Sequence, residues 1–254
     1  MLVRIARFVA PTGLSWGVVE GDEVAAIDGH PFAAITFTGA RWPLAEVRML
    51  SPILPSKVVA VGRNYAEHAR ELGNEVPATP LLFLKPSTSV IGTGDVIRLP
   101  PDSAQVEHEA ELAAVIGRPA KDVAREKALD HVLGYTAAND VTARDQQRAD
   151  VQFTRAKGYD SFCPIGPWIE TVLDPSDLRI TATVSGELRQ DGRTSQMVHD
   201  VAALIAFVSN VMTLLPGDVI LTGTPAGVGP LRDGDRVSIE IEGIGTLTNE
   251  VRAR

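Results

Sequence analysis

Short apolar runs separated by turn residues dominate this sequence, and they limit the possible folds more than any other feature. Runs such as Val58–Gly62, Val219–Leu221 and Val237–Ile241 have the length of strands and are bounded by Gly, Pro and Asp. Only the segment 197–215 repeats apolar residues at the helical period over several turns. Because the strands are interrupted by single helices and do not alternate with them, a doubly wound parallel sheet is disfavoured. The pattern predicts an α+β fold that is mainly β.

The chain divides into two predicted units, a small β-rich N-terminal module with its connector at 1–55 and a larger domain at 56–254. Proline residues at 43, 52 and 55 interrupt the connector. Strands of the module are predicted at Leu2–Phe8, Leu14–Val19 and Val24–Ile27. In the larger domain the periodicity predicts strands at 58–62, 81–84, 134–138, 219–221, 237–241 and 245–251, and helices at 65–72, 125–133, 141–152 and 197–215.

Composition excludes several classes of protein. The formal net charge is −8, and the 24 Lys and Arg residues are scattered among the acids, so no basic patch for nucleic acid is expected. The single cysteine, Cys163, cannot form an intrachain disulfide and is expected to be an inert buried thiol. No run of about 18 apolar residues and no apolar leader segment is found, so we expect a cytoplasmic protein without a membrane span.

The segment 106–117 contains alternating glutamates followed by apolar residues. If it is a strand, period two places Glu107, Glu109 and Glu111 on one face with Ala113 and Val115. Carboxylates beside apolar positions are partly desolvated, and they persist there only with a cation to offset their charge. The alternative is a helix, because Glu, Ala and Leu are good helix formers and Glu107 and Glu111 would share its solvated face. Periodicity does not decide between the two.

A further carboxylate, Asp140, follows a predicted strand and precedes a predicted helix. Capping that helix is the simpler interpretation, because Asp is a common N-cap residue. The alternative is a third metal ligand at the end of the strand. Three carboxylates completed by water would make an all-oxygen site suited to Mg²⁺, Mn²⁺ or Ca²⁺.

Two other segments carry candidate functional groups. His68 and Glu71 lie three residues apart on the predicted helix 65–72, which Asn64 is expected to cap and Gly73-Asn74 to end. A carboxylate beside an imidazole raises its basicity, as a general base requires, although most such pairs are surface features. The glycine-rich turn 222–229 is either a β-turn or a receptor for an anion through backbone N–H groups. Lys85 and Lys157 are isolated lysines of a kind that is usually exposed.

Six segments together resemble the fumarylacetoacetate hydrolase family. They occur in the family's order from about residue 58 to 251: Val-Gly-Arg-Asn-Tyr-Ala-Glu-His (61–68), Phe-Leu-Lys-Pro-Ser-Thr (83–88), His-Glu-Ala-Glu-Leu (108–112), Asn-Asp-Val-Thr-Ala-Arg-Asp (139–145), Gly-Glu-Leu-Arg-Gln (186–190) and Leu-Thr-Gly-Thr-Pro-Ala-Gly-Val-Gly (221–229). Each is weak alone, and their order over nearly 200 residues makes the resemblance specific.

The resemblance implies a fold and a set of site residues. The fold is a mixed β-sandwich roll, usually a homodimer, with a small N-terminal module as in some bacterial members. Segment 106–116 would be a strand, and Mg²⁺ or Mn²⁺ would be bound by Glu109, Glu111 and Asp140, without Glu107. The resemblance further implies that His68 and Glu71 form a catalytic dyad on a mobile lid segment and that Lys157 lies at the reaction centre. It also implies four substrate contacts, which are Arg63, Gln147, Gly223 and Thr224.

Members of this family act on small 2-oxo carboxylic acids or 2-hydroxydienoates, and they share a metal-stabilised enolate. The resemblance implies C–C bond cleavage by hydrolysis or decarboxylation, and the His68–Glu71 pair favours hydrolysis because water needs a base. One alternative is an isomerase of the 2-hydroxyhepta-2,4-diene-1,7-dioate type from aromatic catabolism. A further alternative is a non-catalytic protein that binds a metal or an anion on the same scaffold.

Overall fold

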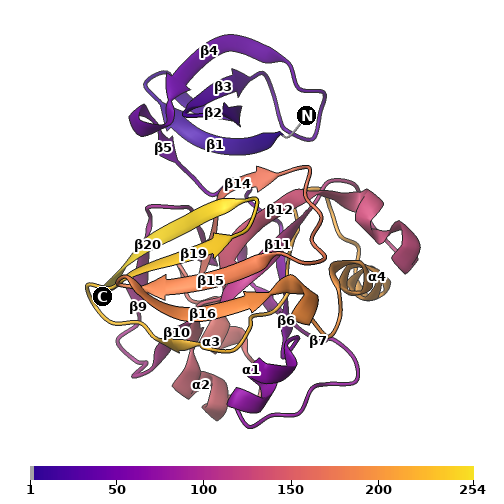
Figure 1. The fold of residues 1–254 in the computed structure, drawn as a ribbon, viewed down its shortest axis with the longest axis vertical. Coiled ribbons are helices and arrows are strands. Elements are labelled where there is room, and N and C mark those ends of the chain that lie inside the picture. The colour runs from indigo at the N-terminus through magenta and orange to yellow at the C-terminus, as the bar shows by residue number, and fades with distance from the viewer. Residues whose placement is uncertain (1–2) are drawn as a thin grey trace.

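The computed structural model describes residues 3–254 and shows a mainly β chain, as the sequence predicts. Five N-terminal strands form a small body at one end of the molecule (Figure 1). They are β1 (Arg4–Ala10), β2 (Gly13–Glu20), β3 (Glu23–Ile27), β4 (Phe37–Pro43) and β5 (Arg48–Met49). The three predicted strands of this module are present, β4 was not predicted, and Leu2, the predicted first strand residue, lies outside the described residues.

The module is joined to the rest of the protein through one continuous sheet. Strands β1 to β4 form an antiparallel meander around Phe8 and Val24, and β1 then pairs with β14 (Cys163–Glu170) at Arg4↔Glu170 and Ile5↔Ile169. Because the sheet crosses from one body to the other, no gap in it marks a boundary. The division at residues 55 and 56 therefore stays a prediction.

Two larger sheets and a small one build the main body. The long sheet has the order β4-β3-β2-β1-β14-β12-β11-β17-β6-β7, and a second sheet has the order β16-β15-β19-β20-β9. The small sheet has the order β13-β10-β18, and the two-residue strand β8 pairs with β14. The strands not yet bounded are β6 (Val58–Gly62), β7 (Leu81–Lys85), β8 (Val90–Ile91), β9 (Val96–Leu99), β10 (Val106–His108), β11 (Ala110–Ile116), β12 (Val132–Asn139), β13 (Thr142–Ala143), β15 (Arg179–Val184), β16 (Glu187–Arg193), β17 (Val219–Leu221), β18 (Gly229–Pro230), β19 (Arg236–Ile241) and β20 (Gly245–Ala253).

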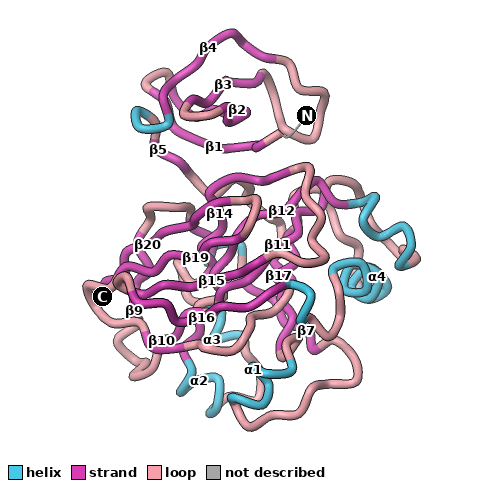
Figure 2. The backbone as a smooth tube through the Cα atoms, viewed as in Figure 1, coloured by secondary structure: helices cyan, strands magenta, loops and turns pink. Residues whose placement is uncertain are grey.

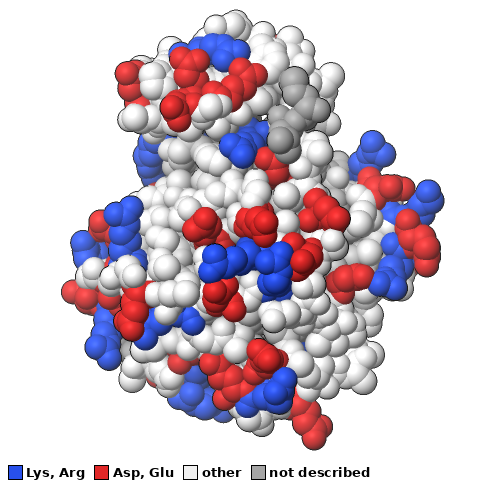
Figure 3. Space-filling view, in the orientation of Figure 1, with Lys and Arg blue, Asp and Glu red and all other residues white. Residues whose placement is uncertain are grey.

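The helices are short and lie mostly at the edges of the main body (Figure 2). They are α1 (Ala66–Glu71), α2 (Arg144–Ala149), α3 (Thr154–Gly158) and α4 (Val201–Val211), with 3-10 turns at Leu44–Glu46, Ser87–Ser89, Arg125–His131 and Thr194–Gln196. Within residues 3–254, no helix combines the length and the apolar character that a membrane-spanning segment requires. On the face shown in Figure 3, acidic and basic side chains are interspersed.

Strand β11 is buried on both faces and forms the centre of the core. Leu112, Ala114 and Ile116 pack into the cluster that includes the second sheet, while Ala113 and Val115 pack into a second cluster with β6 and β17. Burial on both faces explains why the strand reads as a nearly continuous apolar run. The choice between helix and strand for 106–116 is thus resolved in favour of the strand, with an interruption at Glu109 between β10 and β11.

Several predicted helices are shorter than expected. The segment 125–133 is a 3-10 turn that leads into β12, and 141–152 contains the short strand β13 before α2. The helix predicted at 197–215 spans only Val201–Val211, because the Asp200 side chain accepts a hydrogen bond from the Ala203 N–H and begins the helix there. The segment before it is extended, and Tyr65 forms a β-bridge with Met197.

Strands β9, β14, β15 and β16 and helix α3 were not predicted. Within β14, Pro164, Gly166 and Pro167 resemble turn residues in the sequence, although the strand is almost wholly buried. Its apolar residues Ile165 and Ile169 pack beside β11 and β17. Tertiary packing therefore overrides the local turn signal.

Candidate metal site and adjoining cavity

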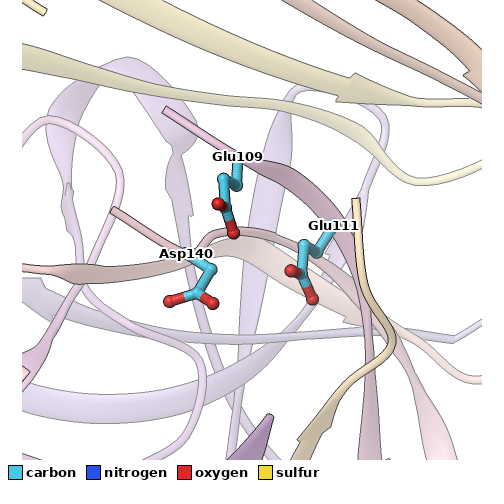
Figure 4. A group of neighbouring side chains, drawn as sticks. All are labelled: Glu109, Glu111 and Asp140. Carbon is cyan, nitrogen blue, oxygen red and sulfur yellow. The ribbon is translucent and has the colours of Figure 1, made fainter. Parts of the chain in front are cut away.

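The three carboxylates named from the sequence lie together in the structure. Glu111 is on β11, Glu109 occupies the interruption before it, and Asp140 follows β12, the antiparallel neighbour of β11. One oxygen from each carboxylate lies within 4.8 Å of the others, and all three residues are buried. The carboxylates point toward one another (Figure 4). Asp140 does not cap a helix, because α2 begins only at Arg144.

Two buried amide side chains hold the interruption at Glu109. Asn139 Oδ1 accepts a hydrogen bond from the Glu109 N–H at 2.9 Å, and Gln190 Oε1 accepts one from the Ala110 N–H at 3.0 Å. The Asp140 N–H donates to the Glu109 carbonyl at 2.9 Å. These hydrogen bonds provide partners for backbone N–H and C=O groups that have no partner in the sheet at the interruption. They also fix Glu109 and Asp140 relative to each other.

Three buried cations surround the carboxylates. Lys157 Nζ lies 2.7 Å from both Glu109 Oε2 and Asp140 Oδ2, and Lys85 Nζ lies 2.5 Å from Asp140 Oδ1. Arg144 donates to Glu109 Oε1 at 2.6 Å and to Glu107 Oε2 at 2.8 Å. The expectation that Lys85 and Lys157 are exposed is wrong. Both are at most 2% exposed, and burial of an ammonium group is tolerated here because each contacts a carboxylate.

The carboxylates differ strongly in their electrostatic environment. Burial would raise the pKa of Glu109, but the charges of Lys157 and Arg144 outweigh it and hold the pKa well below its usual range. Among residues 3–254, no cation contacts Glu111, and its only hydrogen-bond donor is the Gly223 N–H, at 2.7 Å. Burial and the charges of Asp140 and Glu109 therefore raise its pKa well above the ordinary value.

The charges around the triad do not balance without a further cation. Four buried carboxylates (Glu107, Glu109, Glu111 and Asp140) face three buried cations (Lys85, Arg144 and Lys157), so one negative charge is in excess when all are ionised. A divalent cation at the triad would offset that charge and meet three carboxylate oxygens, the donor type that Mg²⁺ and Mn²⁺ prefer. The residues present therefore fit such an ion.

A cavity of about 540 Å³ opens beside the triad. Eight of the ten residues predicted for the site line it: Arg63, His68, Glu109, Glu111, Asp140, Gln147, Lys157 and Thr224. The other two do not line the cavity but contact residues that do, since Glu71 contacts His68 and the Gly223 N–H donates to Glu111. Glu107, which period two places on the same face, pairs with Arg144 and does not line the cavity.

The His68–Glu71 pair forms as predicted, between a buried imidazole and an exposed carboxylate. His68 is 5% exposed, and its Nδ1 lies 3.3 Å from Glu71 Oε2. The Glu71 carboxylate also accepts the Gly227 N–H, at 3.0 Å to Oε1 and 3.2 Å to Oε2. Helix α1 is thereby tied to the glycine-rich segment 222–229.

Asn64 anchors the other end of α1, although it does not cap the helix as expected. Tyr65 occupies the N-cap position, and the Asn64 side chain instead donates to the His199 and Thr222 carbonyls and accepts the His199 N–H. Gly223 lies against Asn64 with φ of 95°, and a Cβ there would approach the Asn64 Cβ to 2.8 Å. Glycine is therefore required where the glycine-rich segment 222–229 meets the base of α1.

Gln190 is a site residue that sequence reasoning did not single out. It is fully buried on β16, and its Nε2 donates to Thr224 Oγ1 and the Pro225 carbonyl, both at 2.7 Å. Thr224 Oγ1 in turn donates to the Ala110 carbonyl at 2.8 Å. The hydroxyl proton is thus committed, so the Thr224 side chain can offer the cavity only a lone pair.

Other residues were also missed as parts of the site, namely Lys85, Arg144 and Asn139. The only signal for them was their position inside the segments 83–88 and 139–145 that carry the family resemblance. Cys163 behaves as expected, because burial raises the pKa of its thiol to about 12 and leaves little thiolate at neutral pH.

Comparison with known proteins identifies the family of this chain. Residues 57–252 match the family described as fumarylacetoacetate (FAA) hydrolase C-terminal, and residues 3–52 match the description Rv2993c-like, N-terminal. The chain belongs to the fumarylacetoacetate hydrolase family. A member from Mycobacterium smegmatis, described as 5-carboxymethyl-2-hydroxymuconate delta-isomerase, is 55% identical, with a TM-score of 0.94 over 99% of this chain and 100% of the other.

Two further members of the fumarylacetoacetate hydrolase family carry other descriptions. A mitochondrial oxaloacetate decarboxylase from Dictyostelium discoideum is 46% identical over 75% of this chain and 90% of its own. A fumarylpyruvate hydrolase from Pseudomonas aeruginosa, solved in complex with Mn²⁺ and pyruvate, is 33% identical, with a TM-score of 0.76 over 80% of this chain and 91% of the other. Relatives of this chain are thus described as enzymes of three reaction types.

Proposed function

We propose that this protein is a divalent-metal-dependent enzyme that cleaves a C–C bond in small 2-oxo carboxylic acids, by decarboxylation or hydrolysis. The observation that carries the proposal is the buried carboxylate triad at the wall of a cavity that also holds His68. Together with Glu107 and the three buried cations, the triad has one negative charge in excess when all these groups are ionised. The relatives described as oxaloacetate decarboxylase and fumarylpyruvate hydrolase support it.

Glu109, Glu111 and Asp140 would hold the ion, which we propose to be Mg²⁺ or Mn²⁺. When bound, it would act as a Lewis acid toward the 2-oxo carboxylate and stabilise negative charge that develops on the 2-oxo group. Lys157 and Arg144 keep Glu109 ionised and in place, because each contacts one of its oxygens. These two cations therefore preserve the ligand geometry before substrate arrives.

His68 is the proposed base. The contact of its Nδ1 with Glu71 orients the ring and leaves Nε2 to accept a proton. In hydrolysis that proton comes from water, and in isomerisation it comes from carbon. Helix α1 is tied at both ends to the segment 222–229, so the ring is presented to the cavity in a defined position.

The test is metal-dependent turnover of a panel of 2-oxo acids by protein first stripped with a chelator and then reloaded. We expect activity with Mg²⁺ or Mn²⁺ and none with the chelator. Absence of turnover on every member of the panel, with metal binding intact, would instead support a non-catalytic binding protein.

An isomerase of the hydroxydienoate type is the second candidate. It is favoured by the relative described as 5-carboxymethyl-2-hydroxymuconate delta-isomerase and by His68, a single base that suffices to move a proton. Ultraviolet absorbance separates the two reactions, because cleavage removes the dienol chromophore and isomerisation shifts it.

A further inference from the structure

One face of strand β7 leads away from the metal site along the wall of the cavity. Successive side chains of a strand alternate between its faces, so Lys85, Phe83 and Leu81 share one face of β7. Lys85 contacts Asp140 of the triad, and Phe83 and Leu81 both line the cavity. Because residues two apart on a strand are separated by roughly 6–7 Å, Leu81 lies roughly 13 Å along the strand from Lys85. The triad is therefore continuous with an apolar wall.

Phe83 joins this wall directly to the carboxylates. The centroid of its ring lies 5.1 Å from Lys157 Nζ, and Lys157 contacts both Glu109 and Asp140. The Phe83 ring also meets the ring of Phe153 edge to face, with the two centroids 5.6 Å apart. Phe153 lines the cavity as well, so the two rings form one apolar corner beside the triad.

An exposed valine extends the apolar lining of the cavity. Val151 lines it together with Leu72, and Val151 is 94% exposed. A single exposed apolar residue is ordinary, but a set of apolar residues that lines a cavity beside a few polar groups is typical of a ligand site. The charged lining residues Arg148 and Asp150 already have side-chain partners in the chain. A ligand that covers Val151 would remove apolar surface from water, which favours binding.

We propose that the wall of Leu81, Phe83, Val151 and Phe153 is a subsite for the carbon chain of a 2-oxo acid and selects long-chain over short-chain acids. The inference rests on the proposed function, because the chain meets this wall only if the 2-oxo carboxylate lies at the triad. An extended chain advances about 1.2 Å per bond, since a three-bond residue spans 3.3–3.6 Å. About six carbons beyond the 2-oxo carbon therefore cover the roughly 7 Å that separate Lys85 from Phe83 along the strand.

The experiment measures the affinities of 2-oxobutanoate and 2-oxooctanoate by calorimetry on the Mg²⁺-loaded protein. Both are monocarboxylates, so no second carboxylate contributes through the arginines of the cavity. Wild type is compared with Phe83→Thr, which removes the ring, and with Val151→Thr, which changes an exposed residue and should leave folding intact. Leu84→Thr is the matched control, because Leu84 is a half-exposed leucine on the opposite face of β7 that does not line the cavity.

We expect wild type to bind 2-oxooctanoate about 15-fold tighter than 2-oxobutanoate. A fully buried methylene increases affinity about fourfold, and the expected ratio corresponds to half-burial of the additional methylenes. Phe83→Thr should reduce the ratio to about fivefold or less, and Val151→Thr should reduce it at least about twofold. In both variants the affinity for 2-oxobutanoate should stay within about twofold of wild type, and Leu84→Thr should keep the wild-type ratio.

Three results would overturn the inference: equal affinity of wild type for the two acids, an unchanged ratio in both cavity variants, or an equal loss of the ratio in Leu84→Thr. If Phe83→Thr does not fold, the ratio of Val151→Thr decides alone. Equal affinity for the two acids leaves the proposed function standing, because both still bind at the metal. If wild type loaded with Mg²⁺ binds neither acid, the proposed function fails and the inference fails with it.

Discussion

Replacing Glu109 and Glu111 by glutamine should have opposite effects on the metal-free protein. Glu109 contacts Lys157 and Arg144 at 2.7 and 2.6 Å and is 4% exposed. An amide there turns an N–H₂ group or a neutral oxygen toward two buried cations, so part of their charge is no longer offset. Breaking a buried ion pair from one side costs about 3–5 kcal/mol.

Glu111→Gln should cost little without metal. Within residues 3–254 no cation contacts the Glu111 carboxyl, and burial together with the charges of Asp140 and Glu109 raises its pKa well above the usual value, which favours its neutral form. A glutamine oxygen can still accept the Gly223 N–H. The metal-free variant should therefore be as stable as wild type or more stable, and increasingly so as pH rises. Because the pKa of Glu111 is raised in the folded state of wild type, its protonated form contributes stability that is fully present below the ordinary carboxyl pKa of the unfolded state. That contribution is lost as the pH rises through the raised pKa.

Thermal unfolding with and without chelator measures both effects. For a chain of this size about 1 kcal/mol corresponds to roughly 2–4 °C, so Glu109→Gln should lower the metal-free Tm by about 6–20 °C. An ion at about 100 times its Kd adds about 2.7 kcal/mol to wild type, and both variants should lose most of this increment. If Glu111→Gln destabilises the metal-free protein as much as Glu109→Gln, the Glu111 carboxylate is charged and compensated there, and the direction of its pKa shift is contradicted. If both variants keep the increment, the triad is not the metal site.

Three other outcomes are expected. Calorimetry of Mg²⁺ binding in buffers of different ionisation heat should show proton release, because the ion requires Glu111 to be deprotonated. A heat of binding that does not depend on the buffer would contradict the raised pKa of Glu111. For a hydrolase, His68→Ala should lower kcat by about 10²- to 10⁴-fold with metal affinity nearly unchanged, and Glu71→Gln should cost less; full activity of His68→Ala would remove water activation as its role. We also propose a homodimer, on family resemblance; a dilution series in the analytical ultracentrifuge that shows only monomer would refute it.

Sequence periodicity correctly predicted those features of the fold that depend on residues close together in the chain. Period two correctly placed Glu111 on the face of Ala113 and Val115, which pack together in one cluster. It did not predict the interruption at Glu109, because that break depends on Asn139 and Gln190, which lie 30 and 80 residues further along the chain. Strand β14 was missed for a related reason, since its prolines signal a turn locally while its burial is decided by neighbouring strands.

The same distinction explains which site residues were found. The carboxylates could be named because Glu109 and Glu111 alternate in one short segment and Asp140 follows a predicted strand. Their cations instead come from β7, α2 and α3, at separations of 17 to 55 residues. The sequence indicates that buried glutamates in this segment need a positive charge beside them. It does not distinguish a lysine, an arginine and a metal ion as the source of that charge. In the structure, lysine and arginine side chains offset only part of the negative charge of the ionised carboxylates. Because Lys157, Arg144 and Lys85 are concentrated on Glu107, Glu109 and Asp140, the uncompensated charge falls on Glu111. A bound divalent ion would therefore interact most strongly with the one ligand that the side chains leave unpaired.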